Sequence, residues 1–407
     1  MKLLRVTAAV FVGLLICTNL PSAPGFPSAQ AQAQKAPSSK KKVPAAKGAP
    51  AAAPERVPFT PEDQQAAAIP DIPDARAWGD SATEFARLLP QAAGPWLAIS
   101  GGGSDGAFGG GVLTGWTESG SRPEFTAVSG VSIGALIAPL AFLGPRYDDE
   151  IRKNFTTITA ADIFEDRMLR DGLFDDWPLR RQIEQRVTPK LLAEIAAEHA
   201  RGRRLYVATT NLDAGRRVVW NMGAIAARAD EKALKLFRDV LLASSSIPGF
   251  FSPVPIEVEA NGKKFNELHG DGTLTAPFFV VPEAMLSAGS TLRPPISELY
   301  LIVNSKLVPE FSLTDRTIAG VLGRSIAVAL TAALRSEIML VYAGAQRKGI
   351  AVRVAHVHAS FNFPSRGAFD GKYMQALYEL GVTAAKQGTA FQDGLVDLSM
   401  RGIGKAQ

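Results

Sequence analysis

Cysteine is almost absent from this sequence, since Cys17 is the only one among 407 residues. A single cysteine forms no disulfide within the chain, so a small disulfide-stapled domain is excluded. Histidine is also scarce, with four residues, and no cluster of His, Cys and carboxylate residues has the spacing of metal ligands. We therefore expect no catalytic metal.

The part of the chain after residue 58 is not basic, although the chain as a whole has a formal net charge of +5. Residues 1–33 carry +2 and residues 34–58 carry +5, which leaves −2 for the remainder. A nucleic-acid-binding protein would show a basic face or stripe. We therefore expect no nucleic-acid partner. With 46% hydrophobic and 20% charged residues, the body has the composition of a globular protein with a substantial core.

The N-terminus has the organisation of an export signal. Lys2 and Arg5 give it a positive start, Val6–Leu20 is apolar, and Ala-Gln-Ala sequences at 29–31 and 31–33 fit a cleavage site. The apolar run is short for a permanent membrane span. Residues 1–33 are therefore predicted to be a signal peptide of an exported bacterial protein, periplasmic or secreted.

Two further N-terminal features bear on localisation. Cys17 ends the run LLIC, which loosely resembles the lipobox of bacterial lipoproteins, although Ile16 stands where that motif has Gly, Ala or Ser. Lipidation at Cys17 is thus an alternative to removal of the whole leader. Residues 34–58 consist almost only of Ala, Pro, Lys, Ser and Gly, and this composition predicts a disordered linker.

From Trp96 onward, short apolar runs alternate with segments of helical pattern. This alternation predicts an α/β domain with a mostly parallel, buried sheet between helices. Strands are expected at 96–100, 125–129, 204–210, 218–222 and 298–304, and helices at 106–118, 132–142, 178–200, 230–245, 314–346 and 370–391.

Two of these segments are long and apolar enough to raise the question of a membrane span. Residues 125–144 carry no charge, but Ser129-Gly130 and Pro139 interrupt them. A strand, a tight turn and a buried helix explain that pattern better. Residues 314–346 contain Arg324, Arg335 and Glu337, which indicates a helix of a soluble protein.

A glycine-rich turn, LAISGGGSDGAFGGG, occupies residues 97–111. Its glycines form the pattern Gly101-x-Gly103-x-x-Gly106. This pattern comes after an expected strand and at the start of an expected helix, as in dinucleotide-binding turns. Such a turn suits a negative group of any kind at a helix N-terminus. A dinucleotide site also needs an acidic residue at the end of the second strand. Glu118 and Glu124 precede that strand, so we expect no nucleotide cofactor.

The strongest single motif is Gly130-Val131-Ser132-Ile133-Gly134, a G-x-S-x-G between an expected strand and an expected helix. Serine at such a turn is held on a sharp bend with its hydroxyl exposed, and the two glycines let the backbone crowd together. The following helix directs its positive end toward a forming oxyanion. Ser132 is therefore a candidate nucleophile.

A serine nucleophile needs a base, and the sequence leaves two options open. His356 and His358 alternate in VRVAHVHAS, so a Ser-Asp-His arrangement of the α/β-hydrolase type is one of them, with Asp271 as the acid. The other is Asp271 itself, which precedes Gly272 in ELHGDGTLTAPFF and can approach a serine hydroxyl directly. His199 lies in a polar helical segment and is expected at the surface.

Taken together, the turn Gly101–Gly106, the Gly130–Gly134 motif and Asp271-Gly272 resemble, in that order, the patatin-like phospholipase family. The stretches 242–254 and 209–223 also look like the family, and the resemblance covers residues 96–391 within a domain at 59–407. It implies a three-layer α/β/α fold and a lipid acyl hydrolase that acts through an acyl-enzyme. Ser132 would be the nucleophile, Asp271 its base, and the N–H groups of Gly101, Gly102 and Gly103 the oxyanion hole.

Two positions depart from the family pattern. Asp105 stands where the family has Arg or Lys, and Thr273 stands where it has Gly or Ala after the Asp-Gly pair. A hydroxyl beside Asp271 would lower the basicity of that carboxylate. These departures leave a catalytically silent binding protein of the same fold as an alternative. A lipid or another acyl ester is the expected substrate, and the sequence leaves peripheral membrane contact open.

Overall fold

The computed structural model describes residues 56–167, 169 and 171–393. The predicted signal peptide, Cys17 and residues 34–55 of the predicted linker lie outside this part of the chain. Residues 56–58 of that linker are described, and the Arg56 guanidinium forms an ion pair with the Asp213 carboxylate at 2.6 Å (Nη2–Oδ2).

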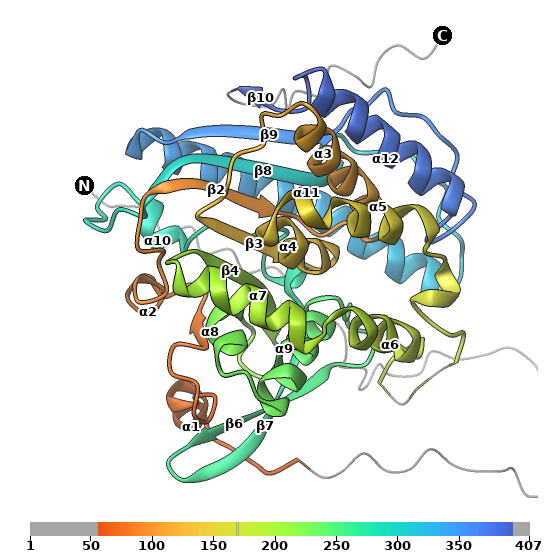
Figure 1. Ribbon diagram of the computed structural model, residues 1–407. Coiled ribbons are helices and arrows are strands. Elements are labelled where there is room, and N and C mark those ends of the chain that lie inside the picture. The colour runs from red at the N-terminus through yellow and green to blue at the C-terminus, as the bar shows by residue number, and fades with distance from the viewer. Residues whose placement is uncertain (1–55, 168, 170, 394–407) are drawn as a thin grey trace, which may run out of the picture. The chain divides into compact units, whose positions relative to one another are not determined.

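The described residues contain a ten-stranded sheet (Figure 1). Its strands are β1 (Arg76–Trp78), β2 (Gly94–Ile99), β3 (Ala127–Val131), β4 (Arg204–Asn211), β5 (Arg216–Asn221), β6 (Val254–Ala260), β7 (Lys263–Asp271), β8 (Ile296–Lys306), β9 (Ala351–Val357) and β10 (Gln392–Asp393). The main path runs β1-β5-β4-β3-β2-β8-β9-β10. Its central strands β4, β3, β2, β8 and β9 are parallel, and antiparallel pairs close both ends.

Helices accompany these strands on both faces. They are α1 (Pro61–Ala66), α2 (Ala82–Ala86), α3 (Gly106–Glu118), α4 (Ile133–Leu143), α5 (Asp148–Thr157), α6 (Trp177–Arg186), α7 (Pro189–Ala200), α8 (Met222–Ala227), α9 (Glu231–Ser244), α10 (Glu283–Leu286), α11 (Ile318–Lys348) and α12 (Gly371–Lys386). The expected strands and most of the expected helices are thus present, with ends shifted by a few residues.

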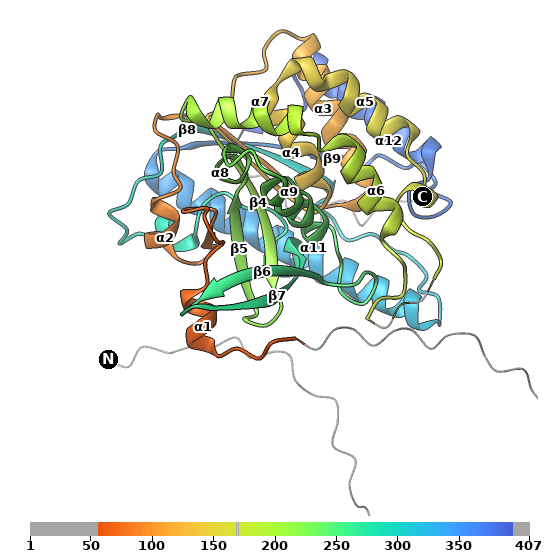
Figure 2. The same cartoon turned by 60° about the horizontal axis from the view of Figure 1, so that its bottom comes forward.

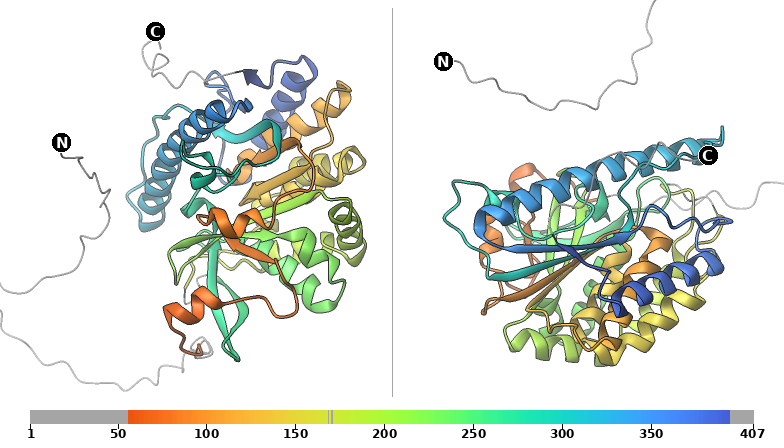
Figure 3. Two further views of the ribbon diagram at one scale, coloured as in Figure 1. Left: turned by 90° about the vertical axis from the view of Figure 1, so that its left-hand side faces the viewer. Right: turned by 90° about the horizontal axis from the view of Figure 1, so that it is seen from above.

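Each face of the sheet has its own hydrophobic core. Leu97 and Ile99 of β2 point into the larger core, which α3, α4, α5, α7, α9 and α12 cover. Trp96 and Ala98 of the same strand point into the smaller core, which α2, α10 and α11 cover (Figures 1–3). Successive side chains of a strand point to opposite faces, so the uninterrupted apolar run of β2 is what a strand buried on both faces requires. The result is the three-layer α/β/α arrangement.

The prediction of one helix over residues 178–200 is wrong in one respect, because the structure has two helices there, α6 and α7. Thr188 caps the second helix by accepting a hydrogen bond from the Leu191 N–H at 3.3 Å. Pro189 occupies the first position of α7. Proline has no N–H to donate and fits a first helical turn but not a helix interior. The break was therefore visible in the sequence.

The sequence also contained a hairpin signal that the strand expectations left out. β6 and β7 are antiparallel and joined by Asn261-Gly262. Both of these residues have positive φ, 53° and 74°. Asn-Gly is the preferred pair for such a two-residue turn. This hairpin is important because Asp271 is the last residue of β7.

The two apolar segments have different environments. Residues 125–144 form β3, the turn and the buried helix α4, as expected. Helix α11, from Gly320 on, is the one helix in the described part of the chain that is long and apolar enough to cross a membrane. Its C-terminal half nevertheless packs on the sheet through Leu334, Ile338 and Val341.

Helices α3 and α12 approach each other so closely that backbone touches backbone. A Cβ atom on Gly111 of α3 would lie 2.0 Å from the carbonyl oxygen of Tyr378 in α12. Conversely, a Cβ on Gly381 would lie 2.4 Å from the Phe108 carbonyl oxygen. Glycine is required at these positions because the neighbouring atoms belong to backbone, which cannot rotate out of the way. The packing of α12 thereby holds α3, whose first turn borders the site described below.

We expect Gly111→Ala to lower the free energy of unfolding by about 1–3 kcal/mol, because the added methyl group forces the two helices apart. Gly371→Ala, at the first position of α12 with no atom within 4 Å of the added Cβ, is the matched control and should be close to neutral. Urea unfolding of both variants tests this. Equal stability of the two variants would contradict the close packing.

Candidate active site

The site forms where two strands meet end to end beside β4. The first half of β4 pairs with β3, so that Val131 lies opposite Ala208. The second half of the same edge pairs with β7, so that Asp271 lies opposite Thr209, the next residue along β4. The chain leaves β3 at Ser132 just where β7 ends at Asp271. Register alone therefore brings together two residues that are 139 positions apart.

Ser132 has the strained backbone that a strand-to-helix turn imposes. Its φ is +56° and its ψ is −126°, a region that residues with a Cβ rarely occupy. The turn is tight enough that a Cβ on Gly130 would lie 2.2 Å from the Gly134 carbonyl oxygen. The Ser132 N–H donates to Ser244 Oγ at 3.0 Å, which fixes the turn against the end of α9. The sharp bend is the one that the motif predicted, but Ser132 is buried rather than exposed.

The Ser132 hydroxyl donates directly to the carboxylate of Asp271, with 2.6 Å between Oγ and Oδ2. The other carboxylate oxygen, Oδ1, accepts from the N–H of Thr273 at 2.8 Å and from its hydroxyl at 2.7 Å. The Asp271 backbone N–H donates to the Ser246 carbonyl at 2.8 Å. Both carboxylate oxygens and the backbone N–H of Asp271 thus have partners, and Oδ2 is the oxygen that contacts the serine.

The environment of Asp271 makes its carboxylate unusually basic. Its side chain is fully buried, and burial raises the pKa, whereas the hydrogen bonds from Ser132 and Thr273 lower it. The net result is a pKa raised to about 6. Because desolvation penalises the charged form, this carboxylate is a stronger base than an exposed aspartate. Thr273 counteracts part of that gain, as expected from the sequence.

The glycine-rich turn lies next to this pair, and the structure corrects one expectation about it. The N–H of Gly101 donates to the Pro277 carbonyl at 3.0 Å, which removes it from the expected set of oxyanion donors. Gly102 has φ +153° and Gly103 has φ +56°. A Cβ on Gly102 would lie 2.2 Å from the Asn304 carbonyl oxygen, so only glycine fits there. The N–H groups of Gly102 and Gly103 remain the candidates.

The other motif glycines serve close packing around the serine and the aspartate. A Cβ on Gly134 would lie 2.4 Å from the Ile99 carbonyl oxygen, and one on Gly272 would lie 2.4 Å from the Ala208 carbonyl oxygen. Gly106, the first residue of α3, lies against Ile133. These contacts place the N-termini of α3 and α4 beside the same point, where both helix dipoles favour negative charge.

Two residues that the sequence analysis did not identify hold the glycine-rich turn in place. Asn304, at the end of β8, accepts from the Gly109 N–H at 3.0 Å and donates to the Ser100 carbonyl at 2.9 Å. Tyr373 of α12 donates its hydroxyl to Asp105 Oδ1 at 2.9 Å. Asn304 could have been noticed as the polar end of the run ELYLIVN, whereas no local signal marks Tyr373.

Asp105, the unusual acid of the turn, occupies the N-cap position of α3. Burial raises its pKa to about 6, against the hydrogen bond from Tyr373, which lowers it. A carboxylate here opposes negative charge at the same helix end when it is ionised, and this opposition disappears when it is protonated. The hydrogen bond from Tyr373 thus holds Asp105 at the N-terminus of α3.

Neither C-terminal histidine reaches the serine. His356 lies near the end of β9, three strand positions from β3, and a strand spacing of about 4.8 Å puts it roughly 14 Å away. Its Nδ1 lies 3.0 Å from the Val357 carbonyl oxygen, and His358 contacts Ser360. His199 is half-buried rather than exposed as expected, with its pKa lowered to about 4 by burial and by Arg204.

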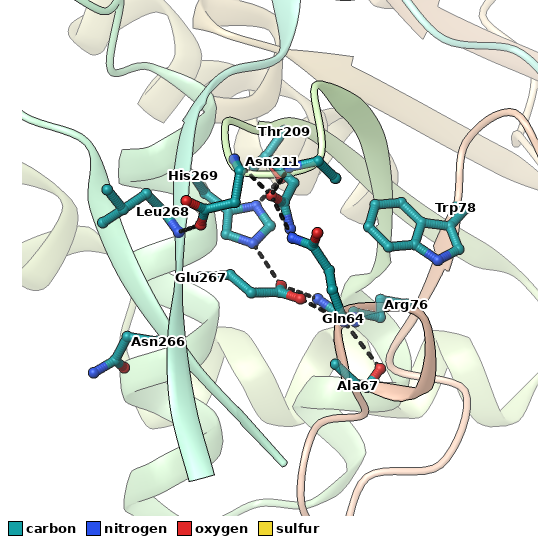
Figure 4. Close-up of polar contacts among 12 residues, drawn as sticks. Gln64, Ala67, Arg76, Trp78, Thr209, Asn211, Asn266, Glu267, Leu268 and His269 are labelled. Atoms are coloured by element: carbon teal, nitrogen blue, oxygen red, sulfur yellow. Dashed lines mark hydrogen bonds and ion pairs between the residues drawn. The ribbon is translucent and has the colours of Figure 1, made fainter. Parts of the chain in front are cut away.

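The fourth histidine lies two residues before Asp271 on β7 but belongs to a buried hydrogen-bond chain (Figure 4). The Trp220 indole N–H donates to Thr209 Oγ1 at 2.8 Å, and Thr209 lies 2.9 Å from His269 Nδ1. Since the indole nitrogen only donates, the threonine hydroxyl is free to donate to Nδ1. His269 Nε2 then donates to Glu267 at 3.1 Å.

An arginine completes this chain on its other side. Burial raises the pKa of Glu267, but the hydrogen bond from His269 and the charge of Arg76 outweigh it and lower the pKa to about 2. Arg76 contacts both carboxylate oxygens, with 3.1 Å from Nη2 to Oε1. The chain ties β1, β4, β5 and β7 together, and both ring nitrogens of His269 are engaged in it by Thr209 and Glu267.

Phe278 and Phe279 follow Asp271 closely along the chain, and both are core residues. Phe278 and Phe279 are buried in the smaller core against Phe85. A separate apolar cavity of about 60 Å³ lies behind Ile133, the residue after the serine. Its lining includes Leu136, Leu140, Phe155, Leu179 and Leu241. In the described part of the chain, no group of three or more His, Cys, Asp or Glu residues could hold a metal ion.

Comparison with known proteins gives one family match. Residues 97–282 match the family model described as "Patatin-like phospholipase". No curated protein matches the chain. Among solved structures, VipD from Legionella pneumophila is similar at a TM-score of 0.36 and 12% sequence identity, over 75% of this chain and 68% of that chain. That structural likeness is too low to support any conclusion about function.

Replacement of Asp271 by Asn is expected to increase stability at about pH 7, by up to about 3 kcal/mol. The pKa of Asp271 is about 6 in the folded state and 3.8 ordinarily, so the folded state binds the proton more tightly than the unfolded chain. The free energy of unfolding therefore falls as the pH rises from about 4 through about 6, and ionised Asp271 destabilises the fold at about pH 7. The gain should disappear below about pH 4, where both states bind the proton. Urea unfolding at the two pH values measures it.

Asp149→Asn, a change at an exposed carboxylate on α5, is the control and should alter stability little at either pH. If Asp271→Asn were no more stable than the parent chain at about pH 7, burial would not destabilise the ionised carboxylate as its raised pKa indicates.

Proposed function

We propose that this chain, whose residues 97–282 belong to the patatin-like phospholipase family, hydrolyses acyl lipids with a Ser132–Asp271 dyad and no histidine. The chain has the patatin fold, with its mostly parallel sheet between helices. The observation that carries the proposal is the 2.6 Å hydrogen bond from Ser132 Oγ to Asp271 Oδ2. A carboxylate that already accepts the serine proton needs no imidazole between the two groups.

In the first step, Asp271 Oδ2 takes the proton while Ser132 Oγ attacks the ester carbonyl carbon. The carbonyl oxygen becomes negative and is stabilised by the N–H groups of Gly102 and Gly103, together with the positive ends of α3 and α4. Collapse of this intermediate breaks the ester bond, and Asp271 returns the proton to the leaving alcohol. The acyl group remains on Ser132.

In the second step, Asp271 takes a proton from the water that attacks the acyl carbon. The bond between the acyl group and Ser132 Oγ then breaks, the carboxylic acid leaves, and Asp271 returns the proton to Ser132 Oγ. A pKa of about 6 suits both halves of the cycle, because the carboxylate is mostly ionised near neutral pH yet accepts a proton readily. Thr273 contributes by occupying Oδ1 with two hydrogen bonds, which leaves Oδ2 for the reaction. The cavity lined by Ile133, the residue after the serine, is mostly apolar, and we infer that it takes part of an acyl chain.

A catalytically silent protein of this fold is the second candidate, and Asp105 is the observation that favours it. An ionised carboxylate at the N-cap of α3 opposes an oxyanion at that helix end. A fluorophosphonate probe separates the two candidates. The hydrolase becomes covalently labelled and loses the label in Ser132→Ala, whereas the silent protein is not labelled in either form.

Ser132→Ala is expected to reduce hydrolysis of short p-nitrophenyl esters by roughly 1,000-fold or more, since it removes the nucleophile. Asp271→Asn should be nearly as damaging, and His356→Ala and His358→Ala should leave most activity intact. Initial rates with thermal unfolding as a folding check measure this. An inactive His356 or His358 variant of normal stability would favour a Ser-Asp-His triad instead.

Thr273→Val is expected to move the acidic limb of the pH–rate profile upward by up to about one pH unit. The change removes a hydroxyl that donates to the Asp271 carboxylate, so the charged form loses stabilisation and its pKa rises above about 6. Since the base must be ionised, activity then appears at higher pH. An unchanged limb in kcat/KM would show that Asp271 is not the titrating base.

A further inference from the structure

The first half of α11 and the loop before it expose a set of large apolar side chains. They form what we call the docking patch, made of Phe311, Leu313, Ile318, Val321 and Val328. Phe311 is 91% exposed and Ile318 84%. Ile318, Val321 and Val328 follow the spacing of one helix face. No side chain of α11 whose burial is described is buried before Leu334, and the N-terminal end of the helix reaches past the strands (Figure 3).

This patch adjoins the active site. Leu322 lies against Gly249, and the Phe250 ring lies beside Gly323, so the inward side of the helix rests on the segment after α9. That segment begins at Ser246, whose carbonyl accepts the Asp271 N–H at 2.8 Å. The outward side of the same two helical turns carries the docking patch. A surface bound to the patch would therefore lie close to the serine.

The charges around the patch indicate the kind of partner. Residues 311–328, which carry the patch, contain one carboxylate, Asp315, and two arginines, Arg316 and Arg324, so cations outnumber anions there. Arg324 hydrogen-bonds the Glu310 carbonyl, and Glu310 itself pairs with Lys306. Apolar side chains interspersed with arginines suit an anionic lipid surface, where the chains enter the headgroup region and the cations meet phosphates. A second copy of the chain would instead bring the same arginines together.

We propose that the docking patch binds the surface of an anionic lipid bilayer and holds the Ser132–Asp271 site close to it. The inference rests on the proposed lipid hydrolysis, because only then does the substrate lie in that surface. The binding is peripheral, since the second half of α11 is part of the smaller core through Leu334, Ile338 and Val341.

The test compares the full chain with the double variant Phe311→Asp/Ile318→Asp, with the same N-terminus in both. Phe311 lies in a loop, and a carboxylate at position 318 falls in the first turn of α11, where the helix dipole favours it. Flotation with vesicles of phosphatidylcholine, with and without phosphatidylglycerol, measures binding. The matched control is Leu292→Asp, an exposed leucine next to the C-terminal end of α11.

We expect the parent chain and Leu292→Asp to float with the anionic vesicles, and the double variant to lose roughly tenfold or more of this binding. Hydrolysis of a soluble p-nitrophenyl ester should stay the same in all three, which also shows that the variant is folded. Phe311→Ser/Leu313→Ser provides a second, uncharged test, and added salt should weaken binding.

The inference is overturned if the double variant floats as well as the parent chain, or if Leu292→Asp loses as much binding. It is also overturned if no form binds vesicles and size-exclusion chromatography shows a dimer that the double variant dissociates, since a second copy would then cover the patch. If flotation depends on the patch but no form hydrolyses the soluble ester, the proposed function fails while membrane docking stands.

Discussion

The active site depends on β4 having two successive neighbours on one edge. β3 runs parallel to its first half and β7 runs antiparallel to its second half, and they meet where Val131 lies opposite Ala208 and Asp271 opposite Thr209. The hydrogen bond between Ser132 and Asp271 follows from this register. Most of the nearby packing keeps the two strand ends in place, including the close contacts at Gly130, Gly134 and Gly272.

The site combines several features that are unfavourable for stability alone. Ser132 has a strained backbone, Asp271 is a buried carboxylate with a raised pKa, and Asp105 is a second carboxylate whose pKa is raised by burial. Such features persist only where the surroundings determine them strongly. Here the surroundings include the α3–α12 contact and the buried chain from Trp220 through His269 to Arg76, both of which lie next to the elements that carry the site.

The two faces of the sheet have different roles. The larger core, with most of the helices, supports the turns that carry the serine and the glycines. The smaller core holds only the second half of α11, which leaves the first half and its apolar side chains exposed beside the active site. One helix thus contributes to the core at one end and exposes apolar side chains at the other. This division explains why α11 has the hydropathy of a membrane span without being buried along its length.

The sequence by itself determined the local elements and the candidate reacting groups. Apolar runs buried on both faces predicted the parallel strands, Gly130 and Gly134 predicted the tight turn at Ser132, and Pro189 and Asn261-Gly262 marked a helix start and a hairpin that could have been predicted. These features depend on neighbours within a few residues, whose steric limits are the same in any fold. The choice between Asp271 and a histidine as base was different, because it depends on strand order and register. Only the tertiary structure bears on it, because β7 lies beside the end of β3 whereas β9 lies three positions away, and this arrangement favours Asp271 in the proposed mechanism. The tertiary structure also decided that the Gly101 N–H donates to the Pro277 carbonyl and that the Tyr373 hydroxyl donates to Asp105. Hydrogen bonds between distant segments have no signature in either segment alone.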